Sequence, residues 1–204
     1  MAAMETKKCR SSNIRDYFGH GEAVEQELQM AISSFSCPRN PDVERFLKNS
    51  AVEFTKKDQS VPYVAFSSES GELLGYFTIA VKPLTIAADR VSRTVAKRLE
   101  RVSRLDEITQ TYTPSAYLIA QLGKNYTGGA NERISGAELL DLVWDVIKSL
   151  QYAAGGVVGF VEAEEREKLL SFYEQNFFQP FDERMSVDTS GEAHKLIQLL
   201  RVIK

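Results

Sequence analysis

The feature that most constrains the fold is a succession of strand, loop, helix and strand in the middle of the chain. Residues 116–124 (AYLIAQLGK) predict a strand, and the apolar spacing up to residue 152 predicts a helix. Residues 155–163 (GGVVGFVEA) predict a second buried strand. A polar loop with glycines joins the first strand to the helix. Such a strand–glycine turn–helix arrangement often holds a phosphate, so this loop is the first candidate binding site.

The rest of the chain alternates helices with short strands. Apolar residues at helical spacing predict further helices over residues 22–35, 42–57, 87–104 and 164–178. Two strands, residues 61–68 and 73–81, predict a hairpin around a turn containing Gly71. Residues 194–203 predict a final strand or short helix. This order indicates an α/β (α+β) fold in which helices flank a mixed central β-sheet, with residues 1–204 as a single domain.

The composition excludes several classes of protein. The 204 residues are 43% hydrophobic and 26% charged, as expected of a soluble globular protein. No apolar run approaches the roughly 20 residues that span a bilayer, and the first residues lack a signal peptide, so we expect a cytoplasmic protein with no membrane contact. Two cysteines and two histidines offer little material for a disulfide framework, and we expect no metal site. The net charge of −3 disfavours broad nucleic-acid binding.

The start of the central helix supports two interpretations. Ser135 and Glu138 have the spacing of a capping box, which needs no ligand. The same helix start offers free N–H groups and about half a unit of positive charge. Gly136 lets a ligand approach the backbone closely, and Arg133 is placed to contact a phosphate. Glu138 would repel that phosphate unless its side chain turns away.

These segments resemble the GCN5-related N-acetyltransferase (GNAT) family. That family carries Gln or Arg, two residues, Gly, one residue, then Gly or Ala, and its backbone amides bind the pyrophosphate of coenzyme A. The first five positions are matched by Arg133, Ile134, Ser135, Gly136 and Ala137, and Glu138 departs from the sixth. The resemblance implies an N-acetyltransferase that uses acetyl-CoA as co-substrate and acetylates a primary amine. It also implies that the pantetheine arm pairs with the backbone of Gln121, Leu122, Gly123 and Lys124.

The segment SFYEQNFF extends the resemblance to the last core helix of the family. Tyr173 matches a tyrosine that commonly protonates the departing thiolate, and a phenol with a pKa near 10 is a suitable donor. The alternative is that Phe172 and Tyr173 only fill the core. Phe177 replaces a family glycine and Arg166 a frequent asparagine. With Glu138, these departures support a competing hypothesis, a non-catalytic binding module with the same fold.

Other segments resemble the acetyltransferases of toxin–antitoxin systems and their phage-associated relatives. The matching residues are Phe35, Cys37, Phe46, Leu47, Gly75, Tyr76, Phe77 and Thr78. This resemblance implies aminoacyl-tRNA as the acceptor and a small DNA-binding antitoxin as a partner. The acceptor itself, the general base and a homodimer stay open. Glu162, at the end of a core strand, is a candidate base that the sequence does not distinguish from water.

A basic stripe marks the predicted helix over residues 87–104. At helical spacing, its cations are Arg90, Arg93, Lys97, Arg101 and Arg104. Such a face can dock on an RNA backbone, which also allows a third hypothesis, a small nucleic-acid-binding protein. The alternative is a solvated surface, and no aromatic residue interrupts the stripe to stack on bases.

Overall fold

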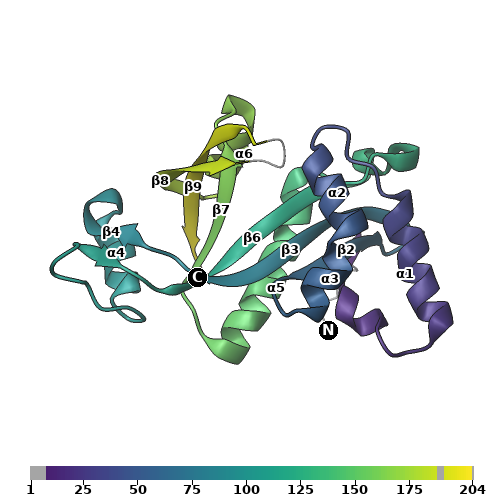
Figure 1. The fold of residues 1–204 in the computed structure, drawn as a ribbon, viewed down its shortest axis with the longest axis horizontal. Helices are drawn as coiled ribbons and strands as arrows, with labels where there is room; N and C mark the ends of the chain where they lie inside the picture. The colour runs from purple at the N-terminus through teal and green to yellow at the C-terminus, as the bar shows by residue number, and fades with distance from the viewer. Residues whose placement is uncertain (1–7, 188–190, 204) are drawn as a thin grey trace, which may run out of the picture. The chain divides into compact units, whose positions relative to one another are not determined.

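A computed structural model describes residues 8–187 and 191–203 (Figure 1). The chain divides into two compact units, each assembled from two separate stretches. Unit 1 comprises Met1–Ala80 and Ala120–Val146, and unit 2 comprises Val81–Ile119 and Ile147–Lys204. Whether both units form the single predicted domain stays a prediction. No helix in the described part of the chain is long and apolar enough to cross a membrane.

The strands of the described residues form a mixed seven-stranded sheet and a separate two-stranded one. The order in the large sheet is β1-β2-β3-β6-β7-β9-β8. Its strands are β1 (Cys9–Asn13), β2 (Val61–Ser67), β3 (Leu73–Pro83), β6 (Ser115–Lys124), β7 (Val158–Glu164), β8 (Gln179–Val187) and β9 (Ala193–Val202). The small sheet pairs β4 (Ile86–Ala87) with β5 (Thr111–Tyr112). The β6–β7 pair is parallel, whereas β7–β9 and β8–β9 are antiparallel, as in the predicted mixed sheet.

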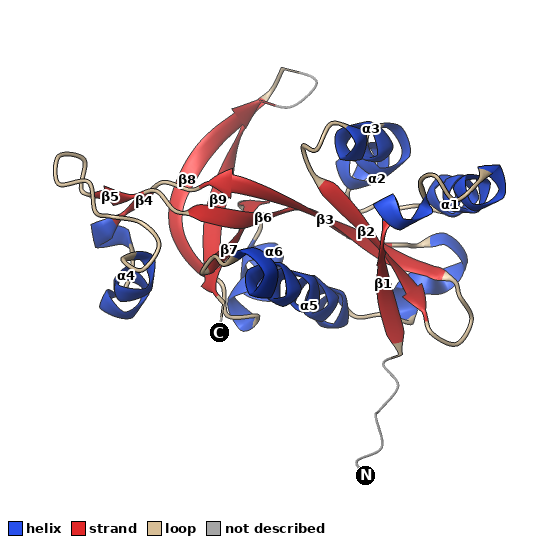
Figure 2. Cartoon of the chain, turned by 90° about the horizontal axis from the view of Figure 1, so that it is seen from below, coloured by secondary structure: helices blue, strands red, loops and turns tan. Residues whose placement is uncertain are grey.

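The helices lie between these strands along the chain. They are α1 (Glu22–Ser34), α2 (Pro41–Asn49), α3 (Ala51–Lys56), α4 (Arg93–Leu99), α5 (Gly136–Ala154) and α6 (Glu167–Gln175). Short 3₁₀ turns cover Ile14–Tyr17, Ala88–Arg90 and Thr127–Glu132. In unit 1, α2 and α3 lie on one side of β2 and β3 and the start of α5 lies on the other (Figure 2).

Unit 1 packs its helices very closely against its strands. Phe35 and Tyr76 are fully buried and meet edge to face with ring centroids 5.2 Å apart. A Cβ added at Gly123 of β6 would lie 2.5 Å from Cγ1 of Val43 in α2. Gly123 is therefore needed for the close approach of α2, which is a packing reason for a glycine in a strand.

Unit 2 contains a helix end with a bulky residue in a glycine conformation. Beyond α6, the Phe178 N–H donates to the Tyr173 carbonyl at 3.0 Å and the Phe177 N–H to the Glu174 carbonyl at 2.9 Å. These two bonds define a Schellman motif, whose left-handed residue is usually glycine. Here Phe177 takes that position with φ 66°. Phe177 therefore preserves the turn at which the family carries glycine, at a backbone cost of about 1–2 kcal/mol.

The prediction of one long basic helix over residues 87–104 is wrong. The helix α4 has only seven residues and ends at Leu99. It begins at Arg93, because the Ser92 hydroxyl accepts a hydrogen bond from the Val95 amide at 3.3 Å and caps the helix there. Arg101 and Arg104 lie beyond its end, so the five cations do not share one helical face.

The other predicted elements agree better with the structure. The helix predicted over residues 42–57 is interrupted at Ser50, which separates α2 from α3. Residues 194–203 belong to a strand, β9, rather than a helix. The hairpin, the strands β6 and β7, and the helices α1, α5 and α6 lie where the sequence predicts them. The strands β1, β4, β5 and β8 were not predicted.

Candidate functional site

The start of α5 in unit 1 forms the predicted capping box. The Glu138 amide donates to the Ser135 hydroxyl at 3.1 Å, and the Ser135 amide donates to the Glu138 carboxylate at 2.8 Å. The bond from the Ser135 backbone holds the pKa of Glu138 below its usual value. The carboxylate therefore folds back on Ser135. The amides of Gly136 and Ala137 are first-turn donors, which a helix leaves without intrahelical acceptors.

Lys124, the last residue of β6, ties the strand to this turn. Its ammonium group donates to the carbonyls of Asn131 at 2.7 Å and Ile134 at 3.1 Å. Ile134 is buried, so the loop is fixed by packing as well as by these bonds. Lys124 thus has a structural role in shaping the loop, beyond the backbone role that the resemblance implies.

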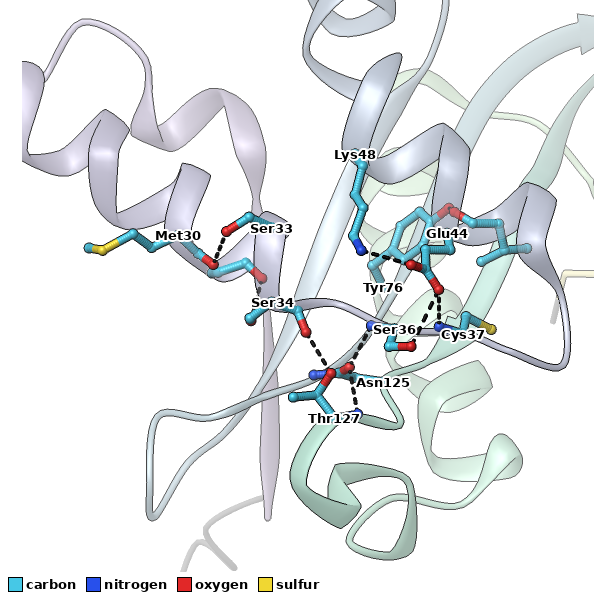
Figure 3. A network of polar contacts seen from close by, with 12 residues as sticks. Met30, Ser33, Ser34, Ser36, Cys37, Glu44, Lys48, Tyr76, Asn125 and Thr127 are labelled. Atoms are coloured by element: carbon cyan, nitrogen blue, oxygen red, sulfur yellow. Dashed lines mark hydrogen bonds and ion pairs between the residues drawn. The ribbon is translucent and has the colours of Figure 1, made fainter.

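Asn125 follows Lys124 and is buried among polar contacts in unit 1 (Figure 3). Its side-chain oxygen accepts from the amides of Ser36 at 3.0 Å and Thr127 at 3.1 Å. Its side-chain nitrogen donates to the Leu73 carbonyl at 2.9 Å. One amide group therefore joins the loop after α1, the start of β3 and the loop that leads to α5. The sequence does not predict the role of Asn125, because two of its three partners, Ser36 and Leu73, are distant along the chain.

The loop between α1 and α2 is tied down by a second set of contacts. The Glu44 carboxylate accepts from the Cys37 amide at 2.7 Å and from Lys48 at 2.7 Å (Figure 3). The bond from Lys48 is the main reason why the pKa of Glu44 lies below its usual value. The Thr127 hydroxyl donates to the Ser34 carbonyl at 2.6 Å. The loop after α1 is thereby joined to α2 through Glu44 and to the loop after β6 through Thr127.

Arg133, the candidate phosphate contact, already has a partner. Its guanidinium forms an ion pair with Glu72 and donates to the Gly128 carbonyl at 3.4 Å. About half of its side chain is exposed to solvent. A bound phosphate would therefore share or replace Glu72 at this guanidinium.

Tyr173, the candidate acid, lies in unit 2 and is only 8% exposed. Its ring lies 5.2 Å from that of Phe172 and 5.3 Å from that of Phe178. Burial raises the pKa of Tyr173 to about 12. The phenol therefore keeps its proton at neutral pH and is a donor, while its ring also belongs to the packing. Arg166, the other departure on this segment, pairs with Glu164 at 2.5 Å beside the start of α6.

The remaining predicted residues lie as follows. The parallel ladder between β6 and β7 consists of two pairs, Tyr117↔Gly159 and Leu118↔Phe160. Gln121 and Leu122 come after this ladder on β6 and are half-buried. In unit 2, the basic set is exposed and forms no ion pair within the described residues; its members are Arg90, Arg93, Lys97, Arg101 and Arg104.

Comparisons with known proteins identify the fold. No protein-family model and no curated protein matches the chain. Among solved structures, a tyrosine-to-phenylalanine variant of KacT is 19% identical, with a TM-score of 0.61 over 97% of this chain and 96% of that chain. AtaT complexed with acetyl-methionyl-tRNAfMet is 16% identical, with a TM-score of 0.61 over 93% of each chain. AtaTR bound with acetyl-CoA is 18% identical, with a TM-score of 0.56 over 97% of this chain and 95% of that chain. The predicted GNAT-like fold is therefore confirmed, and the chain has the fold of KacT and AtaT.

Replacing Asn125 with alanine should strongly destabilise the protein. The change leaves two amides and a carbonyl without their partner, and each buried polar group so orphaned costs about 1–3 kcal/mol. We expect the free energy of unfolding in urea to fall by at least about 2 kcal/mol. Asn131→Ala is the matched control, because Asn131 contributes only its backbone carbonyl to the same loop. Equal, small losses in the two variants would contradict the assigned role.

Proposed function

We propose that the protein is an acetyl-CoA-dependent N-acetyltransferase that acetylates a primary amine. The observation that carries this proposal is the start of α5, where a capped helix offers the amides of Gly136 and Ala137 on a fold shared with a protein solved with acetyl-CoA. The helix start attracts an anion by its dipole and its free donors. The pyrophosphate of coenzyme A is an anion of this kind.

In this proposal the turn from Arg133 to Glu138 binds the pyrophosphate. The objection that Glu138 repels a phosphate is weakened by its geometry, since its carboxylate is folded back onto the Ser135 amide. Arg133 is half-exposed and can contact the phosphates when its ion pair with Glu72 breaks. The backbone of residues 121–124 pairs with the pantetheine arm and sets its direction.

The chemical step needs a nucleophile and a proton for the leaving group. The neutral amine attacks the thioester carbonyl carbon, so a C–N bond forms and the C–S bond breaks. The amine loses one proton to water, and Tyr173 gives its proton to the departing sulfur. Solvent then reprotonates the phenolate. Burial keeps the phenol of Tyr173 protonated at neutral pH, so the proton is present, and the same raised pKa makes the phenol a weaker acid that gives up this proton only as negative charge develops on the sulfur.

We further propose aminoacyl-tRNA as the acceptor and a small antitoxin as a partner. AtaT was solved with acetyl-methionyl-tRNAfMet and, as a variant, with the C-terminus of the antitoxin AtaR. The exposed cations on and around α4 provide a surface for an RNA backbone. The competing class, a non-catalytic module, differs in that it gives no turnover when acetyl-CoA is bound.

Acetyl-CoA should raise the melting temperature of the protein, because a ligand that binds only the folded state stabilises it by about 2.7 kcal/mol at 100 times its Kd. Gly136→Val should abolish the rise, since the new side chain occupies the approach to the turn. Ala153→Val, an exposed site at the other end of α5, should preserve it. Differential scanning fluorimetry measures all three proteins. A wild-type protein that shows no shift at millimolar acetyl-CoA would refute the proposed function.

Tyr173→Phe should keep the acetyl-CoA shift and lower kcat by about 10²–10⁴-fold, the usual effect of losing a general acid. Tyr152→Phe is the control, because Tyr152 is 96% exposed. Since the pKa of Tyr173 is raised, its proton is retained and the wild-type rate should not fall through its ionisation below about pH 10. An unchanged kcat in Tyr173→Phe would leave Tyr173 with a packing role alone.

Charge removal around α4 tests the tRNA proposal. The triple change of Arg93, Lys97 and Arg101 to glutamine should weaken tRNA binding and reduce the slope of log K against log salt by about two to three units. A control triple change of the exposed cations Arg39, Lys56 and Lys57 should leave that slope unchanged. Filter binding with aminoacylated tRNA at several salt concentrations measures both. Wild-type binding that is absent or insensitive to salt would exclude an RNA acceptor.

A further inference from the structure

Unit 2 contains a cavity of about 390 Å³ beside the start of β8, and none of the roles above uses it. The strand β8 begins at Gln179, opposite Leu200, so the last residues of β9, Arg201 and Val202, extend past it. Residues of α4 and of the turn after α6 complete the lining. Val95 of α4 and Leu200 belong to one hydrophobic cluster, which holds α4 against β9. The cavity therefore follows from the packing of unit 2, and its volume is usual for a ligand site, about 300–1,000 Å³.

The lining of this cavity is basic. Within the described residues it contains two arginines, Arg98 and Arg201, and no carboxylate. The Arg98 guanidinium donates to the Ile203 carbonyl at 3.3 Å, and the Arg201 guanidinium donates to the Asn176 carbonyl at 3.1 Å. A neutral carbonyl orients a guanidinium without cancelling its charge, and a guanidinium has five N–H donors. The cavity therefore presents two oriented positive charges, which suit a phosphate.

Phe177, in the same lining, is unfavourable for the fold in two ways. Its φ of 66° is a conformation that glycine adopts without strain, and its ring is 74% exposed. The guanidinium carbon of Arg201 lies 5.5 Å from the ring centroid. Strained residues gather at functional sites, where the conformation serves binding rather than stability. The ring of Phe177 is therefore a candidate contact for a ligand, with a positive charge beside it.

The turn after α6 supplies α4 with the aromatic side chain that the basic stripe lacks in the sequence. Phe177 and Arg98 are far apart along the chain, but they line one cavity in the folded protein. Proteins bind single-stranded nucleic acid with this combination, in which cations contact the backbone and aromatic rings stack on the bases. An acidic peptide would use the arginines but would leave the exposed ring without a stacking partner. The lining therefore favours a nucleotide over an acidic peptide.

We propose that this cavity binds one unpaired nucleotide of an RNA strand, with its base on Phe177 and its phosphate held by Arg98 and Arg201. The inference rests on the RNA part of the proposed function and adds to it a contact that duplex RNA does not make, because paired bases are not splayed out for stacking. It requires neither acetyl-CoA nor an amine. Arg93 and Lys97 of α4 are exposed and lie outside the lining, so positive charge extends past one nucleotide, as a strand requires.

The experiment is a fluorescence anisotropy titration of the full chain with labelled hexa-adenylate RNA, in the absence of acetyl-CoA. Phe177→Leu keeps an apolar residue at the same φ but removes the ring, so binding should weaken at least about fivefold, the loss of one base stack. Phe177→Tyr keeps a ring and should bind like the wild type. Met185→Ala is the matched control, because Met185 of β8 is also largely exposed but lies outside the lining.

Charge and backbone strain provide two further measurements. Arg98→Gln should reduce the slope of log K against log salt by about 0.7, the value for one phosphate contact of a single strand. Phe177→Leu should leave that slope unchanged, and Lys57→Gln in unit 1 should change neither slope nor affinity. Phe177→Gly should weaken binding as Phe177→Leu does and should keep or raise the melting temperature, because glycine relieves the strain at this φ.

Several outcomes would overturn the proposal. They are an absence of wild-type binding to hexa-adenylate, equal affinity for an abasic strand of the same length, and a folded Phe177→Gly that binds like the wild type. Displacement of the RNA by polyglutamate of equal charge would assign the cavity to an acidic peptide instead, and displacement by acetyl-CoA would assign it to the nucleotide of the cofactor.

Failure of this site differs from failure of the proposed function. An acetyl-CoA thermal shift without hexa-adenylate binding would overturn the nucleotide site alone. Hexa-adenylate binding that depends on Phe177, without an acetyl-CoA shift, would support the site and remove the acetyltransferase function.

Discussion

The buried side-chain amide of Asn125 is the contact on which the geometry of the α5 turn depends. It is hydrogen-bonded to three backbone groups, two of them in distant segments and one two residues further along the chain, so it fixes the course of the chain that leaves β6. A buried amide of this kind is stabilising only when its partners are all present, because an orphaned donor or acceptor is costly away from water. Lys124 acts next to it and fixes the carbonyls of the following loop. The position of the capped helix start follows from these neighbouring residues.

The parts of this site that the sequence predicts are those that are local along the chain. The capping box of Ser135 and Glu138 spans four residues, and its spacing alone predicts both hydrogen bonds. Apolar periodicity along the chain likewise predicts strands and helices such as β7 and α5. Tyr173 was identified through a family resemblance, and its burial agrees with either role proposed for it.

The features that the sequence does not predict are of two kinds. Some are contacts between residues far apart along the chain, and others are helix or strand boundaries at which two local sequence signals disagree. The contacts of Asn125 link residues up to 89 positions apart, which no pattern along the chain reveals. The charged strand β8 has few buried residues and no alternation to distinguish it from a loop. The basic helix was predicted too long because periodic cations were counted, whereas the Ser92 cap decides where the helix begins. The sequence singles out Glu162, but its hydrogen bond from Gln198 and its contact with Arg184 follow only from the pairing of β7, β8 and β9.

The capping box has a consequence for the anion binding that we propose at α5. Helix nucleation is entropically unfavourable, and a terminus without a cap frays. Because Ser135 and Glu138 close the first turn without a ligand, an incoming anion meets donors that are already ordered. Little conformational entropy remains to be lost at the turn when the anion arrives. In the proposed function, a phosphate that reaches Arg133 has to compete with one carboxylate, Glu72, whereas the helix start needs no folding.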